Sequence, residues 1–303
     1  MTVIKKQVPS SDGKHSLYGV VVLPEGEAKG YVQVVHGMCE YMGRYEAFLT
    51  FLAEKGYIAF GYDHLGHGKT AKPEEWGYIA DRDGWKYLIR DVSVFKDAVI
   101  KEYGEKPWYL FGHSMGSFIV RGAVGEGARP DKLIVCGTGG PNPISGAGLF
   151  ACKTVKAFCG GHHVSKLITA LAFGAYNKKF SEEKDRAAWL TKDRAVREKY
   201  RHDPMCSFPF TVSAMQDLVT LQKTTNEKKA FRAFPKDLPT LLIAGTDDPV
   251  GAYGKGVEKV CSALKNEGCK VQMKLYENCR HEVLNDSCKE ETKNDVASFL
   301  EAE

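Results

Sequence analysis

A serine stands between two glycines in the stretch LFGHSMGSF, residues 110–118. Gly112 and Gly116 each lie two positions from Ser114, with an apolar run before the motif and small or apolar residues after it. This pattern is typical of a sharp strand-to-helix turn that exposes a serine hydroxyl at the edge of a sheet. Glycines suit the turn because the strand end and the helix start leave no room for Cβ atoms. Ser114 is predicted to be a nucleophile; a helix N-cap serine also fits the junction but does not require flanking glycines.

A serine nucleophile needs a base that accepts its proton and an acid that orients the base. In the chain order serine, acid, histidine, each partner follows a later strand. The run LPTLLIAG leads to Asp247 and Asp248, and the run VQMKLYENC leads to His281. We predict His281 as the base and Asp248 as the acid, and we expect Asp247 to cap its loop or face solvent. His36 and His64 precede Ser114, where loop histidines commonly hold the backbone by hydrogen bonds.

Backbone N–H groups are expected to bind the oxyanion that forms when the serine attacks a carbonyl. In VVHGMCEYMGRY, Gly37 allows an unusual backbone path that presents the N–H of Met38. The second donor is the N–H of Met115, directly after the nucleophile. Gly37 and His113 are predicted to border the substrate, although the His113 side chain is expected to point away from the hydroxyl of Ser114.

Strand-like and helical patterns alternate along the chain and can position these residues. Seven apolar runs predict strands, at residues 18–23, 31–36, 57–62, 108–112, 133–137, 240–244 and 271–276. One apolar stripe at helical spacing predicts a helix before the fourth run: Trp85, Leu88, Val92, Phe95 and Val99. The later runs are apolar on both faces, as in a buried parallel sheet. The sequence therefore predicts an α/β fold with a mostly parallel central sheet and helices on both faces.

The alternation is interrupted once, by an insertion. Residues 139–235 carry helical patterns without a strand-like run, which predicts a helical cap on a core made of residues 1–138 and 236–303. Residues 150–235 hold 16 Lys and Arg against 8 Asp and Glu, so the net charge of +4 conceals a basic cap.

The apolar residues of the cap form two clusters with the spacing of amphipathic helices. The first contains Leu149, Phe150, Val155 and Phe158, and the second Leu167, Ile168, Leu171 and Phe173. The lysines around them are Lys153, Lys156, Lys166, Lys178 and Lys179. Such faces could settle on an anionic lipid surface, or they could pack over the core while the lysines stay solvated. The sequence leaves both interpretations open.

Composition is that of a globular protein: 43% of residues are hydrophobic and 26% charged. No stretch approaches the ~18 uninterrupted apolar residues of a membrane span. The N-terminus has no apolar segment before a cleavage site, and the nine scattered cysteines are typical of reduced thiols. A cytoplasmic location is therefore expected, with peripheral membrane contact through the cap as an open addition. The predicted sheet lacks basic or aromatic ladders, so no nucleic-acid partner is expected.

One group of residues has the types that bind zinc. Cys152 and Cys159 are followed by His162 and His163, but their spacing matches no common zinc pattern. Buried cysteines are usually small apolar residues of a core, so no metal is predicted.

Four motifs give the chain a specific resemblance, and they lie at residues 36–40 (HG-x-x-E), 43–45 (G-R-Y), 63–68 (D-H-x-G-H-G) and 112–116 (GHSMG). Together they resemble the monoacylglycerol lipase and lysophospholipase group of the α/β-hydrolases, within the serine aminopeptidase-like hydrolases. The resemblance covers nearly the whole chain and implies that residues 139–235 form a lid. It also implies the roles reached above, a triad and two oxyanion donors: Ser114, Asp248, His281, Met38 and Met115.

The resemblance implies hydrolysis of a lipid ester through an acyl-enzyme, without a cofactor. The alternatives are a small-molecule carboxylesterase, a serine aminopeptidase-like hydrolase and a catalytically inactive binding protein of the same fold. A serine at the turn excludes haloalkane dehalogenases and epoxide hydrolases, which carry aspartate there, and HGMCE lacks the Gly-Gly-Pro-Gly run of proline iminopeptidases. Met38-Cys39 and Tyr41-Met42 replace the small residues and the His-Ser that similar lipases carry, which leaves the alcohol group of the substrate open. Cys39 is either an inhibitor-sensitive thiol near the site or an incidental loop cysteine.

Overall fold

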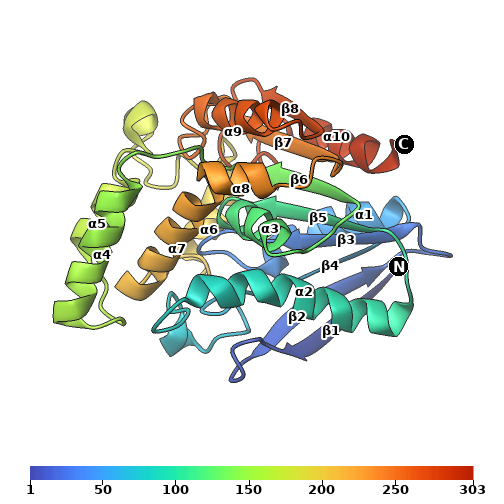
Figure 1. Cartoon of the computed structure of the whole chain (residues 1–303), viewed down its shortest axis with the longest axis horizontal. Helices are drawn as coiled ribbons and strands as arrows, with labels where there is room; N and C mark the ends of the chain where they lie inside the picture. The colour runs from blue at the N-terminus through green and yellow to red at the C-terminus, as the bar shows by residue number, and fades with distance from the viewer. Residues whose placement is uncertain (303) are drawn as a thin grey trace.

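The computed structural model describes residues 1–302, which form an eight-stranded sheet with helices on both faces (Figure 1). The strand order is β1-β2-β4-β3-β5-β6-β7-β8. β2 pairs antiparallel with both of its neighbours, and all other neighbouring strands are parallel. The strands are β1 Thr2–Pro9, β2 Ser16–Leu23, β3 Gly30–Val35, β4 Tyr57–Tyr62, β5 Trp108–His113, β6 Lys132–Cys136, β7 Thr240–Gly245 and β8 Val271–Tyr276. The predicted α/β fold is confirmed.

The seven predicted strands are present, and the eighth strand was missed for a physical reason. β3, β4 and β7 are buried along their whole length, because helices cover both faces of the sheet there. β1 is an edge strand with the sequence TVIKKQVP, and most of its residues are exposed or half-buried. It has no continuous apolar run, so local patterning does not reveal it.

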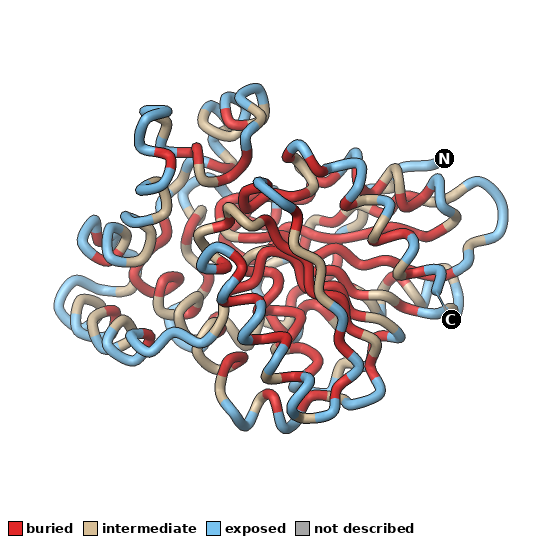
Figure 2. The backbone as a smooth tube through the Cα atoms, turned by 90° about the horizontal axis from the view of Figure 1, so that it is seen from above, coloured by how far each residue is buried: buried red, intermediate tan, exposed pale blue. Residues whose placement is uncertain are grey.

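Two apolar clusters fill the spaces between the sheet and its helices. One cluster joins the sheet to α2 Gly84–Tyr103, α3 Met115–Gly125 and α9 Lys255–Asn266, and the other joins it to α1 Glu46–Glu54 and α10 Lys289–Glu301. Figure 2 shows the strands as a buried centre surrounded by helices with exposed outer surfaces. The predicted stripe on α2 faces the first cluster, since Leu88, Val92, Phe95 and Val99 are buried.

Between β6 and β7 the described chain is helical, as predicted. Its elements are α4 Ser145–Cys159, α5 Lys166–Phe173, η3 Lys178–Glu183, α6 Arg194–His202, α7 Val212–Thr225 and α8 Lys228–Ala233. α7 contacts α2 and α3 of the core, and α4 packs on α7, so α4 lies one layer further out (Figure 1). The division into a core and a cap at residues 139 and 235 stays a prediction. Within residues 1–302, no helix is long and apolar enough to cross a membrane.

Candidate active site

Ser114 lies on the sharp turn between β5 and α3, at the carboxyl edge of the sheet. Its backbone has φ 55° and ψ −119°, an uncommon conformation for a residue that carries a Cβ atom. A Cβ atom on Gly112 would lie 2.4 Å from the carbonyl oxygen of Gly116, and one on Gly116 would lie 2.1 Å from that of Val35. Close packing therefore requires both glycines, as the motif predicts.

Asp248 follows β7 and contacts His281, which follows β8. Oδ2 of Asp248 lies 3.0 Å from Nδ1 of His281, and both side chains are buried. The other oxygen, Oδ1, accepts the N–H of Val250 at 2.8 Å, which fixes the carboxylate. Asp247 instead forms an ion pair with Lys179 of η3, at 2.5 Å between Oδ1 and Nζ. The structure thus brings Asp248, and not Asp247, to the histidine.

His281 and Ser114 line the same cavity. The second ring nitrogen of His281, Nε2, is buried and has no hydrogen-bond partner among the described residues. A general base needs an imidazole that a carboxylate orients through Nδ1 and whose Nε2 is free to accept a proton, and His281 has this arrangement. The catalytic roles of Ser114, Asp248 and His281 stay predictions.

The loop after β3 passes close to Ser114. A Cβ atom on Gly37 would lie 2.9 Å from Cβ of Ser114, so this position accepts only glycine. The unusual backbone expected at Gly37 occurs instead at Cys39, which has φ 54°. Met38 is half-buried and lines the cavity, and Met115 begins α3, so its N–H has no carbonyl one turn earlier in the helix. The two oxyanion donors and the substrate contact of Gly37 stay predictions.

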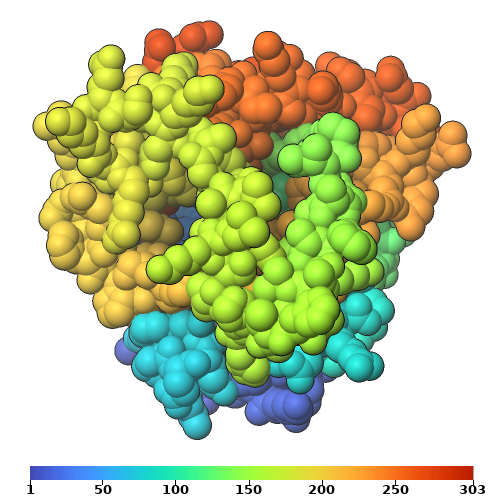
Figure 3. All heavy atoms as spheres, turned by 90° about the vertical axis from the view of Figure 1, so that its left-hand side faces the viewer, coloured from blue at the N-terminus to red at the C-terminus, as the bar shows by residue number. Residues whose placement is uncertain are grey.

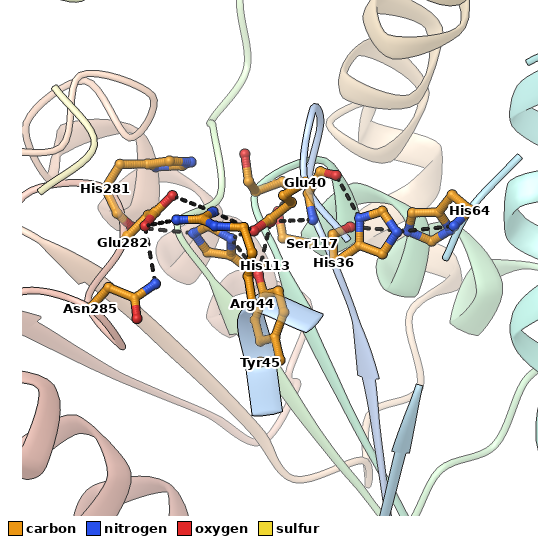
Figure 4. A network of polar contacts seen from close by, with 12 residues as sticks. His36, Glu40, Arg44, Tyr45, His64, His113, Ser117, His281, Glu282 and Asn285 are labelled. Carbon is orange, nitrogen blue, oxygen red and sulfur yellow. Dashed lines mark hydrogen bonds and ion pairs between the residues drawn. The ribbon is translucent and has the colours of Figure 1, made fainter. Parts of the chain in front are cut away.

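A buried polar network centred on Glu40 supports this loop (Figure 4). Oε1 of Glu40 accepts the N–H of Gly37 at 2.5 Å and the hydroxyl of Tyr45 at 2.8 Å, and it lies 3.1 Å from Nδ1 of His113. Oε2 of Glu40 accepts a hydrogen bond from Arg44 at 2.9 Å. The network thus holds the peptide of Gly37, next to the predicted donor Met38.

The same network reaches the loop that carries His281. The guanidinium of Arg44 donates two hydrogen bonds to the carboxylate of Glu282, at 2.8 and 2.7 Å. Sequence reasoning identified Glu40 and Arg44 only as parts of family motifs, and it did not identify Glu282. The pair joins residues 238 positions apart, so no local pattern indicates it.

The ionisation states of Glu40 and His113 are set by their contacts within this network. Burial alone would raise the pKa of Glu40, but the hydrogen bond and charge of His113, with Arg44, outweigh burial and hold the pKa well below its usual value. Burial alone would lower the pKa of His113, but its contacts with Glu40 outweigh burial and raise that pKa. The two side chains therefore form a buried ion pair.

His113 lines the cavity, but both of its ring nitrogens face protein atoms. Nδ1 lies 2.9 Å from the hydroxyl of Tyr45, and Nε2 lies 3.3 Å from the carbonyl oxygen of His281. Through these contacts His113 supports the backbone of His281, and its predicted contact with substrate stays a prediction.

His36 and His64 hold the backbone, as the sequence indicated. Nε2 of His36 accepts the N–H of His64 at 3.0 Å, and Nε2 of His64 lies 3.0 Å from the carbonyl oxygen of His36. His281 therefore remains the histidine that is placed to act as a base.

A cavity of about 1010 Å³ lies over Ser114 and His281. Most of its accessible wall is apolar, and the cap supplies much of it, including Ile168, Leu171, Phe173, Trp189, Met215 and Leu218. Figure 3 looks onto the cap, whose surface is hollowed between its green and yellow segments. A cavity of this size and character can hold a long apolar group with its reactive end at the serine.

The cysteines and histidines that could have bound a metal have different surroundings in the structure. Cys152 is buried and lines the cavity, Cys159 is exposed, and the ring of His162 stacks on Tyr78 at 3.8 Å. Residues 1–302 contain no group of three or more metal-binding side chains placed to hold an ion.

Cys39 lines the cavity, and its Sγ lies 3.3 Å from the carbonyl oxygen of Phe208. Burial raises the pKa of its thiol well above the usual value, so the thiol stays protonated. A protonated thiol is a poor nucleophile, which favours the incidental interpretation of Cys39.

Sequence comparison relates the chain to lipases. The model of a hydrolase family described as serine aminopeptidase, S33, matches residues 26–288. A monoacylglycerol lipase of Mycolicibacterium smegmatis is 25% identical, over 97% of this chain and 98% of that protein. A monoglyceride lipase of Homo sapiens is 25% identical, over 85% of this chain and 77% of that protein.

Solved structures give a similar result. A thermostable carboxyl esterase from Bacillus coagulans, solved in complex with glycerol, has a TM-score of 0.93 and 30% identity, over 99% of this chain and 98% of that one. A lipase in an open form has a TM-score of 0.91 and 25% identity, with the same coverage of both chains. Both similarities extend over nearly the whole molecule.

Proposed function

The chain belongs to the serine aminopeptidase family of hydrolases, and from this premise we propose that it is a serine hydrolase that cleaves lipid esters of the monoacylglycerol type. One observation carries the proposal: a serine on a strained strand-to-helix turn lines the same apolar cavity as a buried histidine bound to aspartate. The names of the similar monoacylglycerol lipases and of the similar esterase support ester hydrolysis.

The proposed reaction has two steps. Oγ of Ser114 attacks the ester carbonyl while Nε2 of His281 takes the hydroxyl proton, and Asp248 holds the imidazole through Nδ1. The N–H groups of Met38 and Met115 bind the oxyanion. His281 then gives the proton to the leaving alcohol, and it activates a water molecule that releases the acid from the acyl-enzyme.

The cavity favours a lipid over a small ester. Its volume of about 1010 Å³ is at the upper end of ordinary ligand pockets, and its wall is mainly apolar. A small-molecule carboxylesterase or an aminopeptidase-like hydrolase is the alternative. Measurement of kcat/KM on monoacylglycerols, lysophospholipids, short p-nitrophenyl esters and aminoacyl amides separates these functions, and we expect the highest value for a monoacylglycerol.

A further part of the proposal concerns the membrane. On α4 and α5, Phe150, Phe158 and Leu167 do not line the cavity and are exposed to between 67 and 87%. Lys153 and Lys166 are exposed near them. An apolar face bordered by positive charge suits an anionic lipid surface from which acyl chains enter the cavity. Two of the five lysines named for this border are engaged in the protein instead, since Lys156 contacts Ser213 and Lys179 contacts Asp247.

The test of the proposed function is the variant Ser114→Ala. Because the chemistry passes through one hydroxyl, we expect a loss of ester hydrolysis of about 10⁴-fold or more and no labelling by a fluorophosphonate. Ser207→Ala is the matched control, since Ser207 is exposed and lies outside the cavity. Hydrolysis retained by Ser114→Ala rules out the serine mechanism, and a wild-type protein that binds lipid without turnover indicates an inactive binding protein.

A further inference from the structure

The imidazole of His281 packs against two other rings. The ring of His113, at the end of β5, has its centroid 4.8 Å from that of His281 with 41° between the planes. The ring of Trp189, in the insertion between η3 and α6, lies 5.1 Å away at 37°. Packing against two rings restricts rotation of the imidazole about its side-chain bonds. The orientation of Nε2 is therefore set by Trp189 as well as by the carboxylate of Asp248.

The backbone that carries Trp189 is bound to the base loop, which we define as residues 277–288. The N–H of Glu282 donates to the carbonyl of Leu190 at 2.7 Å, and the N–H of His281 lies 3.4 Å from the carbonyl oxygen of Trp189. The indole of Trp189 and the imidazole of His281 thus belong to two chain segments whose backbones are hydrogen-bonded to each other.

An ion-pair latch outside the cavity joins the same two segments. The guanidinium of Arg280 contacts the carboxylate of Glu183 and donates to the carbonyl of Ala188 at 2.6 Å. The carboxylate of Glu183 also accepts from Arg197 at 2.6 Å, and the ring of Phe180 lies 4.0 Å from the guanidinium of Arg280. Neither Glu183 nor Arg280 lines the cavity, so the latch can affect the reaction only through the segments that it holds.

We propose that Trp189 is a positioning residue for the catalytic base: its indole holds the imidazole of His281 in the productive orientation, and the latch between Glu183 and Arg280 holds the indole in place. This inference rests on the proposed function, because it takes His281 as the base. It assigns part of the catalytic geometry to the insertion, whereas the triad itself lies in the core.

The chemistry of the two rings gives the contact a second effect. When His281 takes the proton of Ser114 it becomes an imidazolium, and a cation within about 6 Å of an indole is attracted by its π-electrons. The carboxylate of Asp248 stabilises the same charge through Nδ1. Trp189 therefore stabilises the transition state more than the ground state, and its loss reduces kcat.

The first test compares Trp189→Leu with Trp189→Phe. Leucine keeps an apolar side chain but removes the ring, and we expect kcat to fall by about 10-fold with KM unchanged within about threefold. Phenylalanine keeps a ring and is expected to recover most of that loss. Because Trp189 also lines the cavity, kcat and KM are measured on both a short and a long acyl ester.

The two substrates separate positioning from substrate contact. A positioning role predicts the same fractional loss of kcat for short and long acyl chains, since the base serves both. A change confined to KM, or to one chain length, shows that Trp189 contacts substrate only and overturns the inference.

The second test breaks the latch without touching the cavity. Glu183→Gln removes the charge that contacts Arg280, and we expect a fall in kcat of about threefold, with no change in chain-length preference. Glu198→Gln is the matched control, because Glu198 lies on α6 of the same segment and pairs with Arg201 rather than with the base loop. Equal kcat values for the two glutamine variants and the wild type overturn the role of the latch.

Failure of this inference can be told from failure of the proposed function. If wild-type protein is labelled by a fluorophosphonate at Ser114 and the Trp189 variants turn over like wild type, only the positioning role is wrong. If wild-type protein is not labelled and does not turn over, the proposed function is wrong. Circular dichroism and the unfolding temperature confirm that each variant is folded. If Trp189→Leu does not fold, the single variants Trp189→Phe and Glu183→Gln test the positioning role instead.

Discussion

The part of the insertion that precedes α7, residues 141–211, has two halves that meet the rest of the protein in different ways. The outer half, residues 141–175, contains α4 and α5 and exposes apolar side chains to solvent. The anchored half, residues 176–211, contains η3 and α6 and is bound by hydrogen bonds and ion pairs to the loop that carries His281. In the proposed function the two halves have different roles: the outer half contacts the lipid that carries the substrate, and the anchored half orients His281.

The largest expected effect on activity concerns the neighbouring residues Asp247 and Asp248. The side chain of Asp248 contacts His281, the proposed base, whereas the side chain of Asp247 pairs with Lys179 of the anchored half. We expect Asp248→Asn to lower kcat by about 10²–10⁴-fold through misorientation of His281, and Asp247→Asn to cost less than about threefold. Steady-state kinetics on one ester measures both. Reversed effects mean that the acid is Asp247, and equal large effects mean that the contact with Lys179 matters as much as the triad.

The pH dependence of stability tests the contact between the anchored half and His67 of the core. The ring of His67 lies 5.4 Å from the rings of both Phe208 and Phe210. Burial lowers the pKa of His67 from 6.5 to about 3, so between these pH values the unfolded chain binds a proton that the folded protein does not. The free energy of unfolding should therefore fall as the pH drops through this range, by about 1.4 kcal/mol per pH unit for one such histidine.

Urea unfolding between pH 7 and pH 4 measures this dependence. His67→Gln removes the titrating group and should give a shallower loss of stability with acid than the wild type. If the two proteins lose stability in parallel, other groups control the acid response.

The apolar face of the outer half should matter only at a lipid surface. We expect Phe158→Ser combined with Leu167→Ser to lower activity on micellar monoacylglycerol by about 10-fold, since each change removes apolar area that would bury in lipid. Activity on a soluble short ester should be unchanged. Val3→Ser is the matched control, because Val3 is an exposed apolar residue on β1 of the core. A similar loss on both substrates would show that these helices shape the cavity and would break the comparison between the halves.

Charge on the outer half is expected to have a smaller effect than its apolar face. Each of Lys153→Gln and Lys166→Gln should weaken binding to anionic vesicles by about fivefold at low salt, because attraction to such a surface is about 1 kcal/mol per basic residue. High salt should remove the difference, since it screens exposed charges. Vesicle co-sedimentation with anionic and neutral lipid measures it. Equal binding to both lipids, or to neither, identifies the basic cap as ordinary solvated surface.

Local sequence was sufficient for the parts of the site that follow strands. The turn at Ser114 is encoded by Gly112 and Gly116, where an added Cβ atom would collide with the backbone, and Asp248 and His281 each follow an apolar run. Even the preference for Asp248 over Asp247 agrees with the geometry. The edge strand β1 was missed because exposed strands have no buried run to reveal them.

Local sequence did not reveal the contacts that hold the site together. Arg44 pairs with Glu282 across 238 positions, and Arg280 contacts Glu183 across 97. Such pairs depend on how distant segments of the chain come together in the fold, which no periodicity or spacing encodes. The polar contacts of Lys156 and Lys179 could not be predicted either, because the sequence pattern around a lysine does not depend on whether its ammonium group has a partner.

The bonds between Arg280 and the insertion limit how this protein can be recombined with its relatives. The guanidinium of Arg280 is buried and contacts Glu183 and the carbonyl of Ala188, both of which a foreign cap would have to supply. A chimera that exchanges only residues 139–235 leaves a buried charge without its counter-ion, which destabilises the core that received the graft. A stable chimera therefore has to exchange two separate segments together, the insertion and residues 277–288. The 41 residues between them, 236–276, belong to the core and can stay.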